Sequence, residues 1–386
     1  MSRHGRVLVA MSGGVDSSVT AALLHQEGYD VVGVTMKTWD YETSLGGSGA
    51  SRTASGCCSL DDMNDAREVA VRLGVPHLVV DIRDEFGGWV IDRFEADYLA
   101  GRTPNPCVLC NTHIKWAALL RRADALGCDW IATGHYARVR AEGDRWVVSR
   151  GLDRGKDQSY ALWGVAQEHL ARSRFPLGAY TKPQIRQLAA EMGFLGVADK
   201  PDSYEICFVP DDDYRGFLAR RQPDVFARVA GGPYVHAETG ETVGTHEGYP
   251  FYTVGQRRGL GLAMGEPVYV VRIEPETNTV VVGPREALLG RTLSADGVVW
   301  GKAAGLAGET RVTASIRYHD EGTDALATQT GEDAFELVFA TPREAIAPGQ
   351  AVVLYDGDDV LAGGWIDRPP ATAADDDGAF MALPTL

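Results

Sequence analysis

The stretch MSGGVDSS, Met11–Ser18, decides the fold of the N-terminal half of the chain. It follows the apolar run Val7–Ala10 and leads into the apolar-rich segment Val19–Leu24. Its two glycines and three serines suit a tight loop, so the pattern predicts a strand, a loop and a helix. In an open α/β sheet such a loop lies at the carboxyl end of its strand, where these sheets bind their ligands.

Strand-like and helix-like patterns alternate along this half of the chain. The strand-like runs are Arg6–Ala10, Asp30–Met36, His77–Ile82 and Trp130–Thr133. The helix-like segments are Ser17–Glu27, Leu60–Leu73 and Thr112–Leu126, each followed by a glycine that is expected to close the helix. Thr181 is expected to be an N-cap and, with Pro183, introduces a helix over Ile185–Met192. This alternation predicts a parallel sheet covered by helices.

The pattern changes after about Pro210, where β-rich segments replace the alternation. The segments GPYVHAETGETVG and VYVVRIEPETNTVVVG are typical of hairpins, and a further β-rich set from Gly297 to Ile366 predicts a barrel. With 386 residues the chain is long enough for two or three domains. We expect an α/β domain over residues 1–210, a small β-rich domain over 211–292, a β-barrel over 293–367 and a disordered tail over 368–386. The Gly- and Ser-rich segment Asp40–Gly56 is expected to be a mobile loop or lid.

The composition favours a globular cytoplasmic protein, with 45% hydrophobic and 23% charged residues. No run of about 18 apolar residues predicts a membrane span, and the N-terminus lacks the apolar core of a signal peptide. The net charge is −16, yet residues 101–200 hold 15 Lys and Arg against 9 Asp and Glu, so this region carries +6 and the remainder −22. A basic region in an acidic protein is what a phosphate-contacting face would produce, and chance clustering of solvated charges is the alternative.

The loop Met11–Ser18 lacks the residues of two common nucleotide-binding patterns. A Walker P-loop needs a lysine that reaches the β- and γ-phosphates, and this loop has none; the dinucleotide pattern G-x-G-x-x-G is absent too. Amides and hydroxyls at a helix N-terminus suit retention of pyrophosphate during chemistry at the α-phosphate. The motif S-G-G-V-D-S resembles the PP-loop of the ATP pyrophosphatases, which adenylate an acceptor oxygen, release pyrophosphate and displace AMP with a nucleophile. An ordinary strand–helix turn is the alternative.

Three of the six cysteines lie where thiol chemistry is expected. Cys110 precedes the helix that we expect to begin near Asn111 or Thr112, and there the helix dipole would stabilise a thiolate. Cys107 lies three residues earlier, and Cys207 lies far downstream in PDSYEICFVP. Two thiols from separate loops suit sulfur transfer through a persulfide. A buried Cys207 and a partial metal site at C-x-x-C are the alternatives.

Eight motifs occur in order between about Arg6 and about Ile366: SGGVDSS, GCCSLDDMNDAR, TPNPCVLCNTHIKW, ATGHYAR, KDQSYALWG, DSYEICFVP, TVGQRRGLG and SIRYH. Together they resemble the bacterial tRNA-specific 2-thiouridylase family of the PP-loop ATP pyrophosphatases, which places sulfur on C2 of the wobble uridine in certain tRNAs. The resemblance covers most of the chain. It implies an α/β parallel-sheet PP-loop domain of the adenine nucleotide alpha hydrolase type, followed by two small β-rich domains, the last a β-barrel.

The resemblance also implies the functional residues. The ATP site falls on Ala10, Met11, Ser12, Gly13, Gly14, Val15, Asp16, Ser17, Met36 and Gly134, with Mg²⁺ as cofactor and no dedicated metal-ligand set. The catalytic thiols fall on Cys110, the nucleophile, and Cys207, the persulfide carrier. The target base meets Asn105, Pro106 and Cys107, and further tRNA contacts fall on His135, Lys156, Asp157, Gln158, Arg317, Tyr318 and Gln350. Some members have aspartate in place of Cys107, and an iron–sulfur cluster on Cys107, Cys110 and Cys207 is an alternative arrangement.

In the reaction that the resemblance implies, the uridine O2 attacks the α-phosphate of ATP, sulfur from a Cys207 persulfide replaces the activated oxygen, and a Cys110–Cys207 disulfide remains. The implied partners are tRNA with a wobble uridine and a cysteine desulfurase or sulfur-relay protein, with no membrane. Another PP-loop enzyme, such as an amidotransferase synthetase or a lysine-to-tRNA ligase, is the nearest rival but needs neither thiol motif. A non-enzymatic metal or redox module on Cys107 and Cys110 would leave the PP-loop unexplained.

Overall fold

The computed structural model describes residues 2–39, 60–202, 206–209 and 213–368. The expected mobile loop Asp40–Gly56 and the expected tail from residue 369 onward therefore lie outside the described residues. The chain divides into two compact units. The first contains Met1–Ile91, Pro106–Asp213 and Asp358–Val360, and the second contains Asp92–Asn105, Tyr214–Gly357 and Leu361–Leu386.

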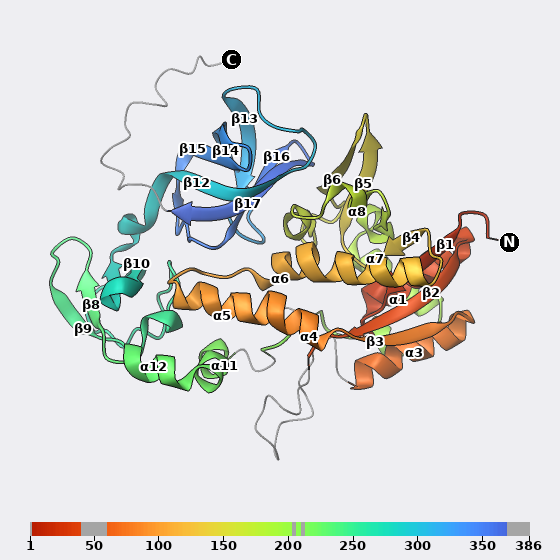
Figure 1. Ribbon diagram of the computed structural model, residues 1–386, viewed down its shortest axis with the longest axis horizontal. Helices are drawn as coiled ribbons and strands as arrows, with labels where there is room; N and C mark the ends of the chain where they lie inside the picture. The colour runs from red at the N-terminus through yellow and green to blue at the C-terminus, as the bar shows by residue number, and fades with distance from the viewer. Residues whose placement is uncertain (1, 40–59, 203–205, 210–212, 369–386) are drawn as a thin grey trace. The chain divides into compact units, whose positions relative to one another are not determined.

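A five-stranded parallel sheet lies at the centre of the first unit (Figure 1). Its strands, in spatial order, are β3 (His77–Asp81), β2 (Asp30–Lys37), β1 (Arg6–Ala10), β4 (Trp130–Ala132) and β7 (Ser173–Arg174). Val7, Leu8 and Val9 of β1 are fully buried, because the central strand of such a sheet is covered on both faces. The sheet confirms the parallel α/β architecture predicted from the alternating pattern.

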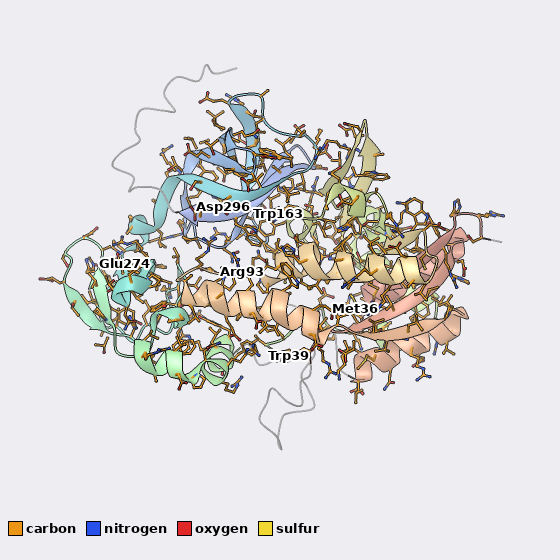
Figure 2. The ribbon with its side chains drawn as sticks, viewed as in Figure 1. Met36, Trp39, Arg93, Trp163, Glu274 and Asp296 are labelled. Atoms are coloured by element: carbon orange, nitrogen blue, oxygen red, sulfur yellow. The ribbon has the colours of Figure 1, made fainter. Side chains whose placement is uncertain are left out.

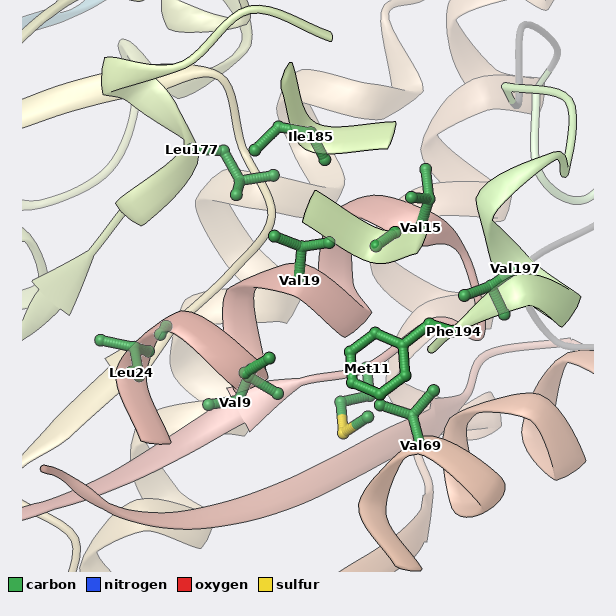
Figure 3. Packing of buried hydrophobic residues seen from close by; sticks show 14 of the residues in the cluster. Val9, Met11, Val15, Val19, Leu24, Val69, Leu177, Ile185, Phe194 and Val197 are labelled. Carbon is green, nitrogen blue, oxygen red and sulfur yellow. The ribbon is translucent and has the colours of Figure 1, made fainter. Parts of the chain in front are cut away.

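The core of the first unit packs β1 against four helices, which are α1 (Val15–Glu27), α3 (Leu60–Leu73), α9 (Lys182–Glu191) and α10 (Leu195–Ala198). Figure 3 shows Val9 of β1 among Val19 of α1, Ile185 of α9 and their neighbours. Each such side chain stabilises the fold by about 1.5–3 kcal/mol when fully buried. Met11 is part of the same core, so the loop that follows β1 starts from a fixed point.

One continuous helical run carries Cys110, and it begins earlier than the sequence predicted. The run consists of α6 (Pro106–Leu109), the π-helix η2 (Cys110–Lys115) and α7 (Trp116–Ala125). The prediction of a helix beginning near Asn111 or Thr112 is therefore wrong. Pro106 takes the first helical position, where its missing N–H costs nothing and its φ is already helical.

The remaining elements of the first unit are short. They are α4 (Arg83–Phe86), the π-helix η1 (Gly87–Ile91), the hairpin strands β5 (Ala137–Glu142) and β6 (Arg145–Arg150), η3 (Ser159–Leu162), α8 (Gln167–Leu170) and η4 (Pro176–Ala179). Residues of η1 lie against η2. Thr181 caps α9 through a capping box with Gln184, as a capping residue should, and α9 begins at Lys182 rather than at Ile185.

The second unit contains helices as well as the predicted β structure. Its helices are α5 (Asp92–Leu99), α11 (Tyr214–Arg221), α12 (Pro223–Val229) and the short η5 (Tyr249–Phe251), η6 (Pro275–Thr277) and η7 (Arg285–Leu288). A four-stranded sheet has the order β10 (Tyr269–Glu274), β11 (Thr279–Gly283), β8 (Pro233–His236) and β9 (Thr242–Thr245). Both predicted hairpins, β8–β9 and β10–β11, are present as antiparallel pairs.

Six antiparallel strands form the barrel that the sequence predicted. Their order is β12 (Leu289–Trp300), β15 (Ala334–Glu344), β14 (Thr323–Gly331), β13 (Thr310–Ser315), β16 (Ala351–Asp356) and β17 (Asp359–Arg368), and β17 pairs with β12 to close the ring. Phe335, Leu337 and Phe339 alternate along β15 and are fully buried, as inward-facing barrel residues should be. Within the described residues, no helix combines the length and apolar character that crossing a membrane requires.

Candidate active site

The loop Met11–Ser18 is anchored to the neighbouring strand β2. The Met11 N–H donates to the Val34 carbonyl at 2.8 Å, and the buried Thr35 hydroxyl donates to the Met11 carbonyl at 2.7 Å. Thr35 Oγ1 also lies 2.9 Å from His77 Nε2 of β3. The loop therefore leaves the sheet at a position that three strands determine.

Hydroxyl groups shape the inside of the loop. Ser17 Oγ accepts a hydrogen bond from the Ser12 N–H at 3.1 Å and donates to the Gly14 carbonyl at 3.1 Å. Ser18 Oγ donates to the same carbonyl at 2.9 Å. Gly14 is the N-cap of α1 and makes no side-chain cap, and the first N–H groups of a helix have no partner within it. The loop thus presents a helix N-terminus, which is an anion-binding feature.

Two glycines permit a close backbone approach at this site. Gly13 has φ +75°, and a Cβ at Gly13 would lie 2.1 Å from the Asp62 carbonyl oxygen of α3. A Cβ at Gly134, which follows β4, would lie 3.0 Å from the Ser17 backbone nitrogen. The motif ATGHYAR therefore packs directly on the loop, and the structure brings Gly134 to the other predicted ATP-site residues.

Asp16 is the acidic residue of the loop, and two side chains from distant segments bind it. Lys182 Nζ lies 2.8 Å from Asp16 Oδ2, and the Tyr136 hydroxyl donates to Asp16 Oδ1 at 2.7 Å. The Lys182 side chain is 9% exposed, whereas that of Asp16 is 32% exposed. Burial and the neighbouring Asp16 carboxylate raise the pKa of Tyr136, so the phenol stays protonated and donates.

Asp202 forms ion pairs with three basic side chains beside the loop. Lys156 Nζ lies 2.7 Å from it, Lys182 Nζ 2.8 Å and Arg186 Nη2 3.0 Å. Burial alone would raise the pKa of Asp202, but the hydrogen bonds from Lys156 and Lys182 lower it to about 2. Asp202 is therefore ionised at neutral pH, and Lys182 is shared between two carboxylates, one of them in the loop.

A further lysine reaches the loop from the end of α10. Lys200 Nζ donates to the Gly13 carbonyl at 3.1 Å and lies 2.9 Å from Asp62 Oδ1. It also pairs with Asp65. Burial tends to lower the pKa of Lys200, but the hydrogen bonds to Asp65 and Asp62 raise it overall. The loop that has no lysine of its own is therefore flanked by the lysines Lys182 and Lys200.

Sequence reasoning missed Lys182, Lys200 and Asp202 as site residues. Lys182 follows the correctly predicted N-cap Thr181, and Asp202 opens the motif DSYEICFVP, so both lay within segments already singled out. The signal available was a PP-loop without its own lysine. Phosphates bound on such a loop need a positive charge that another segment of the chain supplies.

Met36, the residue expected near the adenine, lies at the carboxyl end of β2 and is half-buried. Figure 2 labels Met36 together with Trp39, which follows the end of the same strand. Met36 is paired in register with Val80 of β3. Its own strand, β2, lies two strands away from β4 in the sheet. A methionine at this place presents an apolar surface at the ligand-binding end of the sheet.

The three cysteines of interest occupy different environments in the first unit. Cys110 is 8% exposed and opens η2, Cys107 is exposed on α6, and Cys207 is half-buried. Because Cys110 stands four residues inside a helical run, the argument that a helix N-terminus stabilises its thiolate is wrong. Within the ranges that the structure describes, no three His, Cys, Asp or Glu side chains form a group that could hold a metal ion.

His135, a predicted tRNA contact, is buried beside β4. Its Nδ1 lies 2.6 Å from Thr133 Oγ1, and its ring contacts Trp116 and Phe175 at centroid distances of 5.7 Å and 6.0 Å. Burial, and the charge of Lys115, lower the pKa of His135 well below its usual range. The imidazole is therefore neutral at physiological pH.

The residues Lys156, Asp157 and Gln158 have partners within the first unit. Lys156 binds Asp202, as described above. Asp157 accepts hydrogen bonds from the Gly151 N–H at 2.8 Å and the Ser159 hydroxyl at 2.7 Å. Gln158 Oε1 accepts from the Tyr136 N–H at 3.0 Å. The structure thus uses this turn to hold Tyr136 and the loop carboxylate in place.

The remaining predicted tRNA contacts lie in the second unit. Arg317 and Tyr318 are exposed in the turn after β13, not on a strand. Gln350 Nε2 donates to the carbonyls of Thr103 at 3.3 Å and Pro104 at 3.0 Å. It therefore fixes the backbone immediately before Asn105, the first of the predicted base-contact residues; Pro106 begins α6 in the first unit.

Comparison with family models divides the chain into three matched regions. Residues 5–211 match the tRNA methyl transferase HUP domain, an ATP-binding fold of the PP-loop type. Residues 224–284 match the tRNA methyl transferase PRC-barrel domain, and residues 290–366 match the aminomethyltransferase β-barrel domain. The three matches agree with a parallel-sheet domain followed by two β-rich domains.

The chain is also similar to curated proteins over nearly the whole of their length. The chain is 62% identical to the tRNA-specific 2-thiouridylase MnmA of Salinibacter ruber, over 95% of this chain and 95% of the relative. It is 57% identical to the protein of the same name from Cytophaga hutchinsonii, over 95% of this chain and 98% of the relative. Among solved structures, a 4-thiouridine synthetase in complex with RNA and ATP is 16% identical, covers 57% of this chain and 51% of that chain, and has a TM-score of 0.35.

Proposed function

The chain belongs to the tRNA-specific 2-thiouridylase family and is a sulfurtransferase that acts on tRNA, and from that premise we propose which of its residues carry each step. The observation that carries the proposal is the contact between Lys182 Nζ and Asp16 at 2.8 Å, in a loop that otherwise offers amides and hydroxyls. This combination suits a triphosphate that reacts at its α-phosphate.

ATP would bind on Ala10–Ser17, with its phosphates on the N-terminus of α1 and its adenine near Met36 and Gly134. Gly134 lets the backbone lie close to the loop, since a Cβ there would lie 3.0 Å from the Ser17 nitrogen. Lys182 and Lys200 supply the positive charge that the loop itself lacks. Mg²⁺ uses one or two carboxylates plus phosphate oxygens, and the 32% exposed carboxylate of Asp16 fits that requirement. When bound, the ion would neutralise charge on the departing pyrophosphate.

The first chemical step would activate the wobble uridine. The base must leave its stack to enter a site on the enzyme, which costs a few kcal/mol and less in an unpaired loop. Its O2 attacks the α-phosphorus, the bond to the bridging oxygen breaks, pyrophosphate leaves and N3 loses its proton. Buried cations near the loop stabilise the charge that develops on the phosphates more strongly than water would.

The second step would replace O2 by sulfur. A Cys207 persulfide delivers its terminal sulfur to C2, and AMP leaves with the oxygen. Cys110 attacks the sulfur–sulfur bond either before the transfer, releasing hydrosulfide that attacks C2, or after it. Both routes leave a Cys110–Cys207 disulfide, which a thiol reductant reopens with two electrons. A cysteine desulfurase or a sulfur-relay protein would restore the persulfide.

The tRNA would meet the target-base residues Asn105–Cys107, together with the exposed turn at Arg317 and Tyr318. Gln350 supports this assignment indirectly, since it fixes the two carbonyls before Asn105. The buried His135 and the half-buried Asp157 would act by holding the site in shape rather than by touching phosphate.

Nucleoside mass spectrometry tests the proposal. Wild-type protein, tRNA, Mg-ATP and a persulfide source should give 2-thiouridine at the wobble position, and Cys110→Ala and Cys207→Ser should still release pyrophosphate as they adenylate the uridine but should yield no 2-thiouridine. Cys128→Ala is the matched control, because Cys128 is buried in the same unit away from these motifs. Full single-turnover transfer by Cys207→Ser would overturn the thiol assignment, and pyrophosphate release with another acceptor would overturn the thiolation step.

A further inference from the structure

A cavity of about 440 Å³ lies on the helical surface beside η2, outside every residue assigned above. Its lining includes Trp89 and His113, Ala117 and Leu120 of α7, and Arg121 and His169. Its volume falls within the range of about 300–1,000 Å³ that is usual for small-ligand pockets. All of these residues belong to the first unit.

The feature that distinguishes this cavity is a stacked and exposed aromatic pair. The rings of Trp89 and His113 are 4.8 Å apart and inclined by 18°. Trp89 is 57% exposed, the most exposed aromatic side chain among the large hydrophobic residues that the structure describes as exposed. Exposing an indole costs hydrophobic stabilisation, and an exposed ring already aligned with a second ring offers a flat face to another planar group.

The position of the pair relates it to the reaction centre. His113 lies in η2, three residues after Cys110, and Trp89 lies in η1, which packs against η2. Three residues make up less than one turn of helix. The ring pair therefore lies within one turn of Cys110 along the helical run, close to where a base next to the target uridine would lie.

Two π-helices, η1 and η2, carry the ring pair and Cys110. Single-turn π-helices are rare and occur often at functional sites. Here they place Cys110 and His113 on the same short helix and bring Trp89 beside it from a separate segment. An ordinary α-helix through Cys110–Lys115 would rotate the two side chains differently about the axis, because it closes a turn with fewer residues.

Besides His113, the polar residues that line the cavity are Glu85, Arg121, Asp124 and His169. His169 Nδ1 is buried and has no hydrogen-bond partner among the described residues. The Arg121 guanidinium lies 3.6 Å from the Glu85 carboxylate, so the cavity lining offers a hydrogen-bond donor and an acceptor next to each other. Apolar walls with a small number of placed polar groups are what a pocket for one planar heterocycle needs.

We propose that this cavity is a stacking site for an unpaired anticodon-loop base of the tRNA, next to the uridine that is thiolated. Recognition of unpaired RNA relies on stacking of splayed bases on aromatic side chains. A protein partner fits less well, since a stable protein interface needs about 1,000 Å² or more, which is more than one small cavity offers. The proposal rests on the assignment of Cys110 to the target uridine.

The test measures binding of a fluorescent anticodon stem-loop without ATP, so that it does not depend on chemistry. Trp89→Ala should weaken binding by roughly tenfold or more, Trp89→Phe should restore most of the affinity, and Gly88→Ala should leave it unchanged. Gly88 is the matched control, because a Cβ there meets no heavy atom within 4 Å. Trp89→Ala should leave the slope of affinity against salt unchanged, because stacking releases no counterions.

A double-mutant cycle identifies the base. Removing the base of one loop nucleotide other than the wobble uridine should weaken binding to the wild type but not to Trp89→Ala. If every abasic position costs both proteins the same, or if Trp89→Ala binds the stem-loop normally and instead loses a sulfur-relay protein, the proposal is overturned. Cys110→Ala separates the two assignments: it should bind the stem-loop normally and fail in thiolation. Sulfur transfer by that variant would overturn Cys110 as the nucleophile, whereas the binding of Trp89→Ala decides by itself whether the ring pair contacts the stem-loop.

Discussion

Lys182 Nζ lies 2.8 Å from one carboxylate oxygen of Asp16 and 2.9 Å from the other, although 166 positions separate the two residues. The contact joins the first position of α9 to the first turn of α1. It gives the PP-loop a buried cation that does not come from the loop. The same Nζ also lies 2.8 Å from Asp202, so any phosphate that draws Lys182 away from Asp16 leaves its second partner in place.

Replacing Lys182 tests this role. We expect Lys182→Gln to reduce kcat/KM for ATP–pyrophosphate exchange by about 100-fold or more, as removal of a preorganised donor at developing charge usually does. We expect it to lower the free energy of unfolding by about 1–2 kcal/mol, less than a fully buried pair because Asp16 is 32% exposed. Arg186→Gln is the matched control, since Arg186 pairs with Asp202 but not with Asp16. Equal losses in the two variants would show that the charge cluster is structural.

The two glycines of the loop differ in a way that substitution can reveal. Gly13 has φ +75° and faces the Asp62 carbonyl, where a Cβ would lie 2.1 Å away, whereas a Cβ at Gly14 would meet only Ser12 Oγ at 3.7 Å. Gly13→Ala should therefore weaken ATP binding at least about tenfold, and Gly14→Ala, which keeps its N–H, should weaken it far less. Isothermal titration with ATP measures both. Similar affinities for the two variants would mean that the loop adapts and that its shape is not fixed by α3.

Asp202 gives the stability a specific pH dependence. Its pKa of about 2 lies below the usual 3.8, so the folded state favours the carboxylate; the resulting stabilisation is complete above about pH 4 and is lost as the pH falls through 2. It amounts to about 2 kcal/mol. We expect Asp202→Asn to lower the free energy of unfolding at pH 7 by about that amount, and the difference from wild type to shrink between pH 4 and pH 2. Urea unfolding at each pH gives the difference, and a gap that does not change with pH would contradict the assignment.

The sequence was informative where the structural cause is local. Gly28, Gly74 and Gly127 close helices because each adopts a positive φ, and Thr181 caps α9 through Gln184; both signals lie within a few residues. The motif spacing likewise located the loop at the end of β1. Lys182 could not be placed on Asp16 in the same way, because that contact depends on the packing of α9 against α1.

At Cys110 the prediction failed although a local signal, a proline at the first position of the helix, was present in the sequence. Pro106 marks a helix start, but the predicted helix was placed from Thr112, after the two cysteines. A turn of the π-helix Cys110–Lys115 holds more residues than a turn of α-helix. A sequence pattern with a period of 3.6 residues therefore does not continue in phase from one side of this segment to the other. The consequence is chemical as well as geometric. The thiolate of Cys110, the nucleophile that we propose, would therefore need a source of stabilisation other than a helix N-terminus.

Arg317 and Gln350 should affect tRNA binding through different physics. Arg317 is exposed in a turn, so Arg317→Ala should weaken binding and reduce the slope of log affinity against log salt by about one phosphate contact. Gln350 donates to the carbonyls of Thr103 and Pro104 and meets no phosphate there, so Gln350→Ala should weaken binding by loosening the segment before Asn105 and leave the slope unchanged. Fluorescence anisotropy with one tRNA at several salt concentrations separates the two effects. A reduced slope for Gln350→Ala would place that side chain on the tRNA backbone, and an unchanged slope for Arg317→Ala would remove the turn after β13 from the phosphate-binding face.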